Sequence, residues 1–305
     1  MLDIKVIREN RGLVKENLKK KFQEAKLPLI DEVRALDERW RKLKTDSDAL
    51  RAQRNTVSKQ VSEAKKAGKD ASELLKQAKK IPEQIEDIEK ESNLLQDKIN
   101  GIMLQIPNII SDETPLGKDA TENKEIKRGG KVPNFKFEVK NHVQLAEKQN
   151  LADFDASAKV AGNGFYYLKG DLALLNQALI RFAIDFMTKK GYEYIEPPLM
   201  LNAKSIYASM DKKAIEQSVY DIKDEDLHLI GTAEQALLAM QSGKTFQEAE
   251  LPKRYVSYSM CMRKEVGSHG INDKGLWRTH QFNKVEQFIF CKPEDSWKLH
   301  EELIK

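Results

Sequence analysis

The sequence has little cysteine, few aromatic residues and no long apolar run. Cys261 and Cys291 are far apart and form no CxxC pair, so they offer no disulfide framework and suit a reducing compartment such as the cytoplasm. No histidine or cysteine pair has metal-ligand spacing, so we expect no zinc site. The most apolar segment, residues 172–187, is interrupted by Arg181 and Asp185, which excludes a membrane span. We expect no signal peptide, because the N-terminus has no apolar region.

Charge is plentiful instead, at 33% of residues, and its distribution is more informative than the net value of +4. Residues 41–80 contain twelve Lys+Arg against five Asp+Glu, whereas residues 81–100 contain two against six. A positive band confined to one segment indicates a polyanionic partner that is met by that segment. A solvated helix face has the same composition, so charge alone leaves both interpretations open.

Apolar residues in the first hundred positions recur in alternating steps of three and four. One such stripe runs from Leu36 to Val61 and another from Ile81 to Ile102. This spacing keeps one face of each helix against a partner helix. The two stripes predict an antiparallel coiled-coil hairpin on the order of 45 Å long, at about 30 residues an arm.

The turn of this hairpin is expected between the two stripes. Gly68 is suited to end the first helix, and Asp70 with Glu73 matches a capping box for the second. Pro82 predicts either a kink or the true start of the return helix.

An intermolecular coiled coil or a scaffold rod would show similar stripes. Polar Ser47, Arg54 and Ser92 at seam positions weaken a long uniform zipper. The positive charge also lies toward the tip of the hairpin, where a rod has no use for it. An arm that reaches a nucleic acid accounts for both features.

Composition then divides the chain into three parts. We expect a helical hairpin over residues 1–110, a linker rich in Thr, Asn, Gly, Lys and Pro over 111–134, and a second domain over 135–305. In the second domain, the pattern predicts a helix over 172–190 and a short strand over 192–196. It also predicts a helix over 232–242.

Two segments of the second domain alternate with period two. They run from Tyr255 to Glu265 and from His280 to Phe290, and predict a long antiparallel strand hairpin. One face gathers the following side chains: Arg263, Glu265, Phe282, Lys284 and Glu286. A guanidinium can grip a phosphate, a phenyl ring can stack on a base, and a carboxylate can hold an ammonium group. An amphipathic hairpin with a solvated face is the simpler alternative.

Three sequence motifs resemble those of the seryl-tRNA synthetases, which are class II aminoacyl-tRNA synthetases. Arg263-Lys-Glu265 followed by Gly275-Leu-Trp-Arg-Thr-His-Gln-Phe-Asn-Lys-Val-Glu286 is similar to motif 2 of that family. Residues 191–199 resemble motif 1, the dimer-forming helix and strand. Residues 229–234, Leu-Ile-Gly-Thr-Ala-Glu, resemble the serine-contacting loop, and the N-terminal hairpin is similar as well.

The resemblance implies an α+β protein, in which the helical hairpin precedes a partial class II catalytic domain built on an antiparallel sheet. It implies serine–tRNA ligase activity in a cytoplasmic homodimer. Serine and ATP, with Mg²⁺, would give seryl-adenylate and pyrophosphate, and the seryl group would then pass to tRNA. The hairpin would grip the long variable arm of serine tRNA through the following basic residues: Arg41, Lys44, Arg51, Arg54, Lys59, Lys65, Lys66 and Lys69.

Carried over residue by residue, the resemblance makes Arg263 catalytic, in contact with the α-phosphate of ATP and the serine carboxylate. The implied ATP-binding residues are Arg263, Lys264, Glu265, Arg278, Thr279, His280, Gln281 and Phe282, with adenine stacked on Phe282. The implied serine-binding residues are Thr232, Ala233, Glu234, Arg263 and Glu286, with the α-ammonium group on Glu286. Lys264 stands where the family usually has a small residue, and the period-two pattern points it away from the active face.

The family's motif 3 is not recognisable in this sequence. That region supplies a second ATP-binding arginine, a magnesium-binding glutamate and the residue that contacts the serine hydroxyl. We therefore expect a C-terminally incomplete catalytic domain, and the explanations include a fragment, one half of a split synthetase, and a non-catalytic tRNA-binding or dimerising paralogue. The last is disfavoured because a pure binding protein has no use for Arg263, Phe282 and Glu286.

Overall fold

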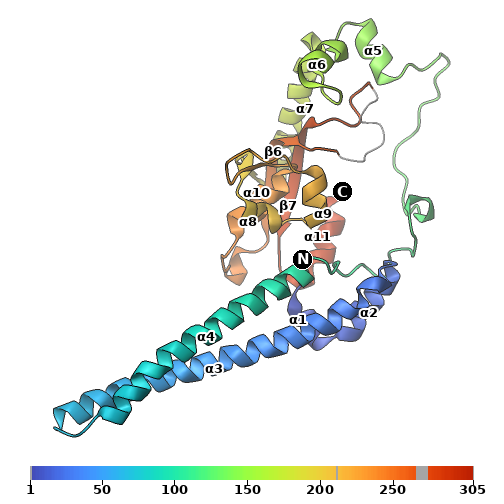
Figure 1. Cartoon of the computed structure of the whole chain (residues 1–305). Coiled ribbons are helices and arrows are strands. Elements are labelled where there is room, and N and C mark those ends of the chain that lie inside the picture. Colours follow the sequence, from blue (N-terminus) through green and yellow to red (C-terminus); the bar gives the residue numbers. More distant parts are fainter. Residues whose placement is uncertain (1, 211, 266–273, 305) are drawn as a thin grey trace. The chain divides into compact units, whose positions relative to one another are not determined.

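The computed structural model describes residues 2–210, 212–265 and 274–304, without the side chains of Lys212 and Lys213 (Figure 1). The chain divides into two compact units, Met1–Gly130 and Lys131–Lys305.

The first unit is dominated by two long antiparallel helices, α3 (Leu27–Lys66) and α4 (Ser72–Met103) (Figure 1). Apolar side chains of the two sequence stripes are buried between them, among them Val57 on α3 and Ile81 and Ile99 on α4. The helical hairpin expected from the alternating three- and four-residue steps is therefore confirmed.

The turn between α3 and α4 agrees only in part with the one expected from the sequence. Gly68 ends α3 with a φ of +66°, and the Lys69 amide donates to the Ala64 carbonyl at 2.9 Å. The expected capping box of Asp70 and Glu73 is wrong. The Asp70 carboxylate accepts from the amide and hydroxyl of Ser72, which closes a local turn before the helix begins.

Pro82 does not start the return helix, because α4 runs unbroken from Ser72 through Pro82 to Met103. Its neighbours Ile81 and Ile85 are buried against α3, and this packing stabilises the helix across the position where proline removes one backbone hydrogen bond. The alternative that placed a helix boundary at Pro82 is thus wrong.

Two short helices close the base of the hairpin: α1 (Ile4–Glu9) and α2 (Arg11–Lys20), followed by the 3₁₀ turn η1 (Glu24–Lys26). Their apolar side chains join those of α3 and α4 in one core. Arg8 of α1 reaches the Asp37 carboxylate of α3 with two hydrogen bonds of 2.6 and 2.8 Å, and Asp37 is 1% exposed. A fork of this kind stabilises a buried carboxylate and fixes α1 on α3.

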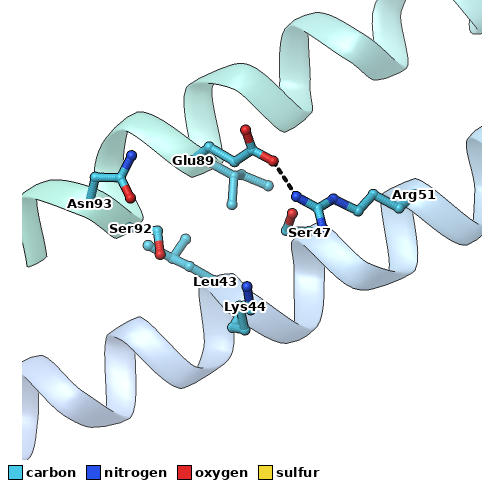
Figure 2. Close-up of a pocket in the computed structure, with 8 residues that line it drawn as sticks. Leu43, Lys44, Ser47, Arg51, Glu89, Ser92 and Asn93 are labelled. Atoms are coloured by element: carbon cyan, nitrogen blue, oxygen red, sulfur yellow. Dashed lines mark hydrogen bonds and ion pairs between the residues drawn. The ribbon is translucent and has the colours of Figure 1, made fainter. Parts of the chain in front are cut away.

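The middle of the hairpin is polar rather than apolar. A cavity of about 190 Å³ lies there, and Figure 2 shows Ser47 and Arg51 of α3 facing Glu89 and Ser92 of α4. Arg51 donates to the Glu89 carboxylate at 2.6 Å across the helix pair. The apolar contacts lie on either side, in one cluster at the base and another toward the tip. The seam is therefore interrupted where the sequence places its polar residues.

Residues 104–141 contain little regular structure apart from the 3₁₀ turn η2 (Ala120–Glu122), and almost all side chains from 118 to 141 are exposed. The second unit then begins with short elements that lead to one long helix. They are α5 (His142–Lys148), β1 (Ala152–Asp153), α6 (Phe154–Ala161), β2 (Tyr167–Leu168) and α7 (Gly170–Lys189).

The central sheet of the second unit has the strand order β3 (Glu193–Ile195), β6 (Lys253–Met262), β7 (Gln281–Phe290). Strands β6 and β7 are antiparallel and pair from Lys253 with Phe290 to Met262 with Gln281, which confirms the predicted strand hairpin. Strand β3 pairs parallel with β6, so the sheet is mixed rather than antiparallel throughout. The long connection between β3 and β6 allows this crossover. The α+β class is confirmed.

The connection between β3 and β6 carries the elements that cover one face of the strand hairpin. They are β4 (Met200–Leu201), α8 (Ala203–Tyr207), α9 (Lys212–Ser218), β5 (His228–Leu229), α10 (Ala233–Gln241) and η3 (Glu248–Glu250). Strands β4 and β5 pair antiparallel. The described chain closes with η4 (Pro293–Asp295) and α11 (Ser296–Leu303).

Helix α7 buries no side chain fully. Several of its large apolar residues are exposed, with Leu174 at 68% and Phe182 at 66%. A stripe of this size is unusual on a soluble surface. Within the described residues, no helix combines the length and apolar character needed to cross a bilayer.

Candidate nucleotide and amino-acid site

The strand register brings the predicted face of the β6–β7 hairpin together. Ser257 pairs with Glu286, Ser259 with Lys284, and Cys261 with Phe282, in residue pairs that alternate along the strands. Since side chains of directly paired residues lie on the same face of a sheet, these six share one side. The three β6 side chains are small and at most 1% exposed, which leaves the longer β7 side chains to reach across the face.

Arg263 follows directly after β6 and is held at three points. Its amide donates to the His280 carbonyl at 2.9 Å, which extends the strand ladder by one step. Its Nε donates to the Gly231 carbonyl at 3.1 Å, and its guanidinium carbon lies 5.0 Å from the centre of the Phe282 ring. A cation over an aromatic face is attracted by the ring quadrupole. The guanidinium is thus oriented before any ligand binds.

The loop before α10 completes the site from the other side. Thr232 is the N-cap of α10, and its hydroxyl donates to the Glu286 carboxylate at 2.6 Å. The Glu234 amide donates to the same carboxylate oxygen at 3.1 Å. The Glu286 side chain thus accepts hydrogen bonds from the first turn of α10 and links β7 to this helix.

Two residues that the sequence reasoning did not assign to the site also form it. The Lys284 ammonium donates to the Thr232 hydroxyl at 2.7 Å and to the Glu286 carboxylate at 2.8 Å. Gln235 is 1% exposed and accepts from the Gly231 amide at 2.9 Å, which fixes the loop against α10. The period-two pattern had placed Lys284 on the correct face, whereas nothing in the sequence indicated a buried Gln235.

A cavity of about 470 Å³ lies beside these side chains. Three predicted ligand-binding residues line it, Thr232, Glu234 and Arg263. The remaining lining residues come from α8 to α10 and the loops between them, namely Ser209, Met210, Ala214, Ser218, Val219, Gly231 and Gln235. The cavity therefore has a cationic side at Arg263 and an anionic side at Glu234.

Burial, and then the negative charge of Glu286, raise the pKa of the Glu234 carboxyl, while the Lys284 ammonium lowers it. Two carboxylates close together in a half-buried site disfavour the ionised form of one of them. Glu234 is therefore harder to ionise than an exposed glutamate, and a further cation close to it would favour its charged form.

The other predicted ATP-binding residues lie where the strands give way to the loop. Arg278 forms an ion pair with the Glu265 carboxylate, and Glu265 adopts a φ of +51°. The His280 Nδ1 lies 3.0 Å from the Tyr220 hydroxyl, and the Thr279 hydroxyl donates to the Gln281 carbonyl at 2.9 Å. These contacts fix the conformation of the segment that directly precedes β7.

Lys264 faces away from this group, as the period-two pattern predicts. Its ammonium donates to the Asp221 carboxylate at 3.0 Å, and its amide donates to the Ser218 carbonyl. The same Asp221 carboxylate lies 2.8 Å from Nδ1 of His228, so Lys264 belongs to a polar cluster beside the site.

The predicted Gly-rich tip of the strand hairpin, with Gly267 and Gly270, lies outside the described residues. Its return segment is described from Lys274 onward, where the Lys274 ammonium pairs with Glu147 and Asp155. At Gly275 a β-carbon would come 2.7 Å from His142, so glycine is required for this close approach.

Comparison with known proteins identifies the chain. Residues 1–110 match the model of the seryl-tRNA synthetase N-terminal domain, and residues 217–305 match that of the class II tRNA synthetase core domain (G, H, P, S and T). A serine–tRNA ligase of Methanocella arvoryzae is 45% identical over 304 residues, which are 100% of this chain and 72% of that protein. The chain belongs to the seryl-tRNA synthetase family.

Structural comparison agrees with this family assignment. The crystal structure of seryl-tRNA synthetase from Pyrococcus horikoshii complexed with ATP matches with a TM-score of 0.85 at 37% identity, covering 100% of this chain and 72% of that one. Cytoplasmic serine–tRNA ligase from Naegleria fowleri in complex with AMP matches with a TM-score of 0.79 at 28% identity, covering 100% and 74%. The resemblance first seen in three motifs thus extends over the whole chain.

The basic residues predicted on the arm of this synthetase-family chain are all exposed. Three of the eight already pair within the arm: Arg41 with Asp37, Arg51 with Glu89, and Lys59 with Glu63 at 4.0 Å. For the other five, the described part of the chain provides no ion pair, and these are Lys44, Arg54, Lys65, Lys66 and Lys69. The lysines that remain open to a polyanion thus concentrate at the tip.

The raised pKa of Glu234 predicts that Glu234→Gln stabilises the fold in a pH-dependent way. Below the ordinary glutamate value of 4.5, the carboxyl is protonated in both the folded and the unfolded chain and costs nothing. As the pH rises through that value and then through the raised one, the folded chain must ionise a disfavoured group, so it loses stability. We expect the variant to exceed the wild type at pH 7 by less than about 1 kcal/mol after solvent screening, and to equal it near pH 4.

Urea denaturation followed by circular dichroism at both pH values measures this difference. Glu225→Gln, which removes an exposed carboxylate from the same connecting segment, is the control and should change little at either pH. A variant that is less stable than the wild type at pH 7 would show that Glu234 supports the fold through its charge.

Proposed function

We propose that this chain binds ATP and serine in the site beside Arg263 and takes part in seryl-adenylate formation and transfer of the serine to tRNA. The observation that carries the proposal is the arrangement around one cavity. Arg263 and Thr232 line the cavity, Arg263 also lies over the Phe282 ring, and the Thr232 hydroxyl donates to Glu286. The relatives support it, since they are named serine–tRNA ligases and one solved neighbour is complexed with ATP.

On the nucleotide side, Arg263 grips the α-phosphate while Phe282 stacks on the adenine. A guanidinium that is already fixed by Gly231 and the Phe282 ring loses little freedom when it binds an oxyanion. The nucleotide side would also include the residues that lie close to Arg263 and Phe282 in the sequence. These are the ion pair of Glu265 and Arg278, together with Thr279, His280 and Gln281. Arg278, which forms an ion pair with Glu265, would lie near the pyrophosphate, as the family resemblance implies.

On the amino-acid side, the serine ammonium binds to Glu286 and the Thr232 hydroxyl, with Ala233 and Glu234 at the start of α10 closing the pocket. The serine carboxylate then faces Arg263, which also holds the α-phosphate. One cation that orients nucleophile and electrophile promotes in-line attack, and it offsets the charge that develops as pyrophosphate leaves.

Magnesium accompanies ATP in this chemistry and neutralises phosphate charge. Among the described residues, no group of three or more His, Cys, Asp or Glu side chains could hold a metal ion.

The arm serves tRNA binding. Its exposed basic residues are suited to phosphates, which position an RNA without reading its bases, so recognition of serine tRNA by its long variable arm rests on shape.

The exposed apolar stripe on α7 beside the motif 1 strand supports a homodimer formed through that helix. We place the protein in the cytoplasm, where tRNA is charged.

Arg263→Ala tests the proposed activation step. We expect serine-dependent ATP–pyrophosphate exchange to fall by about 10²- to 10³-fold, because the variant loses a preorganised cation at the reacting phosphate. Arg254→Lys is the matched control: Arg254 lies on β6 as well, but its guanidinium pairs with Glu302 at 2.9 Å, away from the cavity. The variant and control are measured in the 305-residue chain and in a chain extended to the length of its relatives. Exchange that survives in Arg263→Ala would refute the role, and exchange absent from both wild types would refute the activity.

The arm is tested by replacing Lys65, Lys66 and Lys69 together with glutamine. We expect weaker tRNA binding and a shallower dependence of log K on log salt, by up to about 0.9 for each phosphate that the arm no longer neutralises. Filter binding at several salt concentrations measures both quantities. A matched triple variant of exposed linker lysines, Lys124, Lys127 and Lys131, loses the same charge and should keep the wild-type slope. Equal slopes in the two variants would contradict binding at the tip.

A further inference from the structure

The Lys284 ammonium lies at the centre of the proposed serine site. It donates to the Thr232 hydroxyl at 2.7 Å and to the Glu286 carboxylate at 2.8 Å, while the Thr232 hydroxyl itself donates to Glu286. The three groups form a closed triangle of hydrogen bonds. The Lys284 side chain is 30% exposed and that of Glu286 is 17% exposed, so this ion pair is partly shielded from water.

The two acceptors of Lys284 are the two groups proposed to bind the α-ammonium of serine. A lysine ammonium and an α-ammonium have the same charge and the same three N–H donors. Both cannot hold Glu286 and Thr232 in the same geometry at once. We propose that Lys284 is a placeholder, whose ammonium occupies the position of the serine α-ammonium and is displaced when the amino acid binds. This inference rests on the proposed function.

The side chain of Lys284 can move without any movement of its backbone. Its backbone is fixed in β7 opposite Ser259, but the ammonium sits on a flexible four-carbon stem. Within the described residues, its hydrogen-bond partners are Thr232 and Glu286, both of which the substrate would take over. Displacement therefore needs a side-chain rotation and no change in the strand.

When the Lys284 ammonium is displaced, electrostatics favours its movement toward the Glu234 carboxylate. Glu234 is half-buried and lines the cavity, and the charge of Lys284 already reaches it. Lys284 is bonded to the Glu286 carboxylate, and its charge also acts on the carboxyl of Glu234. After an amino acid binds, its ammonium pairs with Glu286 and Lys284 pairs with Glu234, which gives each carboxylate its own cation. The exchange keeps the charge of the site balanced.

A placeholder also makes the site selective for amines. A ligand with an ammonium group replaces the contacts that Lys284 gives up, whereas a ligand without one leaves Glu286 uncompensated if it moves Lys284 aside. The binding of serine therefore includes competition with Lys284, and the binding of a hydroxy acid that lacks the amine does not.

Isothermal titration calorimetry on the 305-residue chain separates these two cases. The probes are L-serine and 3-hydroxypropionate, which lacks the ammonium group. We expect Lys284→Met to bind serine about three- to tenfold more tightly than the wild type, because the competing ammonium is gone, and to leave 3-hydroxypropionate binding unchanged. Lys284→Arg keeps the charge and should bind serine within about twofold of the wild type. Lys284→Gln removes the charge with less change in polarity, and repeats the test if the methionine variant does not fold.

Lys253→Met is the matched control, because Lys253 lies at the far end of β6 and pairs with Glu250. It should leave serine binding unchanged. Serine binding that weakens in Lys284→Met and in Lys284→Gln would overturn the placeholder and make Lys284 a residue that supports the ligand. Unchanged serine binding would overturn it as well. A wild-type chain that binds no serine would instead contradict the proposed function itself.

Discussion

The Glu286 carboxylate connects segments that are far apart in the sequence, and the rest of the site depends on this contact. Its bonds to the Thr232 hydroxyl and the Glu234 amide span 54 and 52 residues and fix the N-terminus of α10 on β7. The loop so fixed includes Gly231, whose carbonyl accepts from Arg263. This partly buried carboxylate at a helix N-terminus thus fixes the loop that carries Gly231, and with it the Arg263 guanidinium, against β7.

The same contact explains why one carboxyl of the site is well bonded while its neighbour is hard to ionise. Glu286 has hydrogen-bond partners and is satisfied, whereas Glu234 lies close to it and has a raised pKa. Ligand sites commonly keep such unfavourable groups, because the ligand relieves them. In this chain, the positive charge of Lys284 offsets part of the pKa increase of Glu234, and the serine ammonium would offset more of it.

Much of this could be predicted from the sequence, because the governing patterns are local. Period-two alternation placed Arg263, Phe282 and Glu286 on one face, and the strand register confirms that face. Alternating three- and four-residue steps likewise predicted the helical hairpin. A turn residue such as Gly68 acts through its own φ angle, which a single position in the sequence is enough to suggest.

The failures have non-local or competing causes. The parallel pairing of β3 with β6 depends on a long crossover that no periodicity records. Asp70 had two possible local partners, and the nearer Ser72 took the place of a capping box. The roles of Lys284 and Gln235 follow from which loop lies against β7, and this is decided only when the chain folds. Residue types alone therefore predict a face, while the contacts across it need the structure.

The central claim is that the guanidinium of Arg263 and the carboxylate of Glu286 bind the two ends of a single ligand. A crystal structure of the chain with a non-hydrolysable seryl-adenylate analogue tests this most directly. We predict adenine stacked on Phe282, the phosphate mimic on Arg263, and the α-ammonium bonded to Glu286 and the Thr232 hydroxyl. An analogue bound away from Arg263 and Phe282, or bound there with the ammonium turned away from Glu286, would contradict the claim.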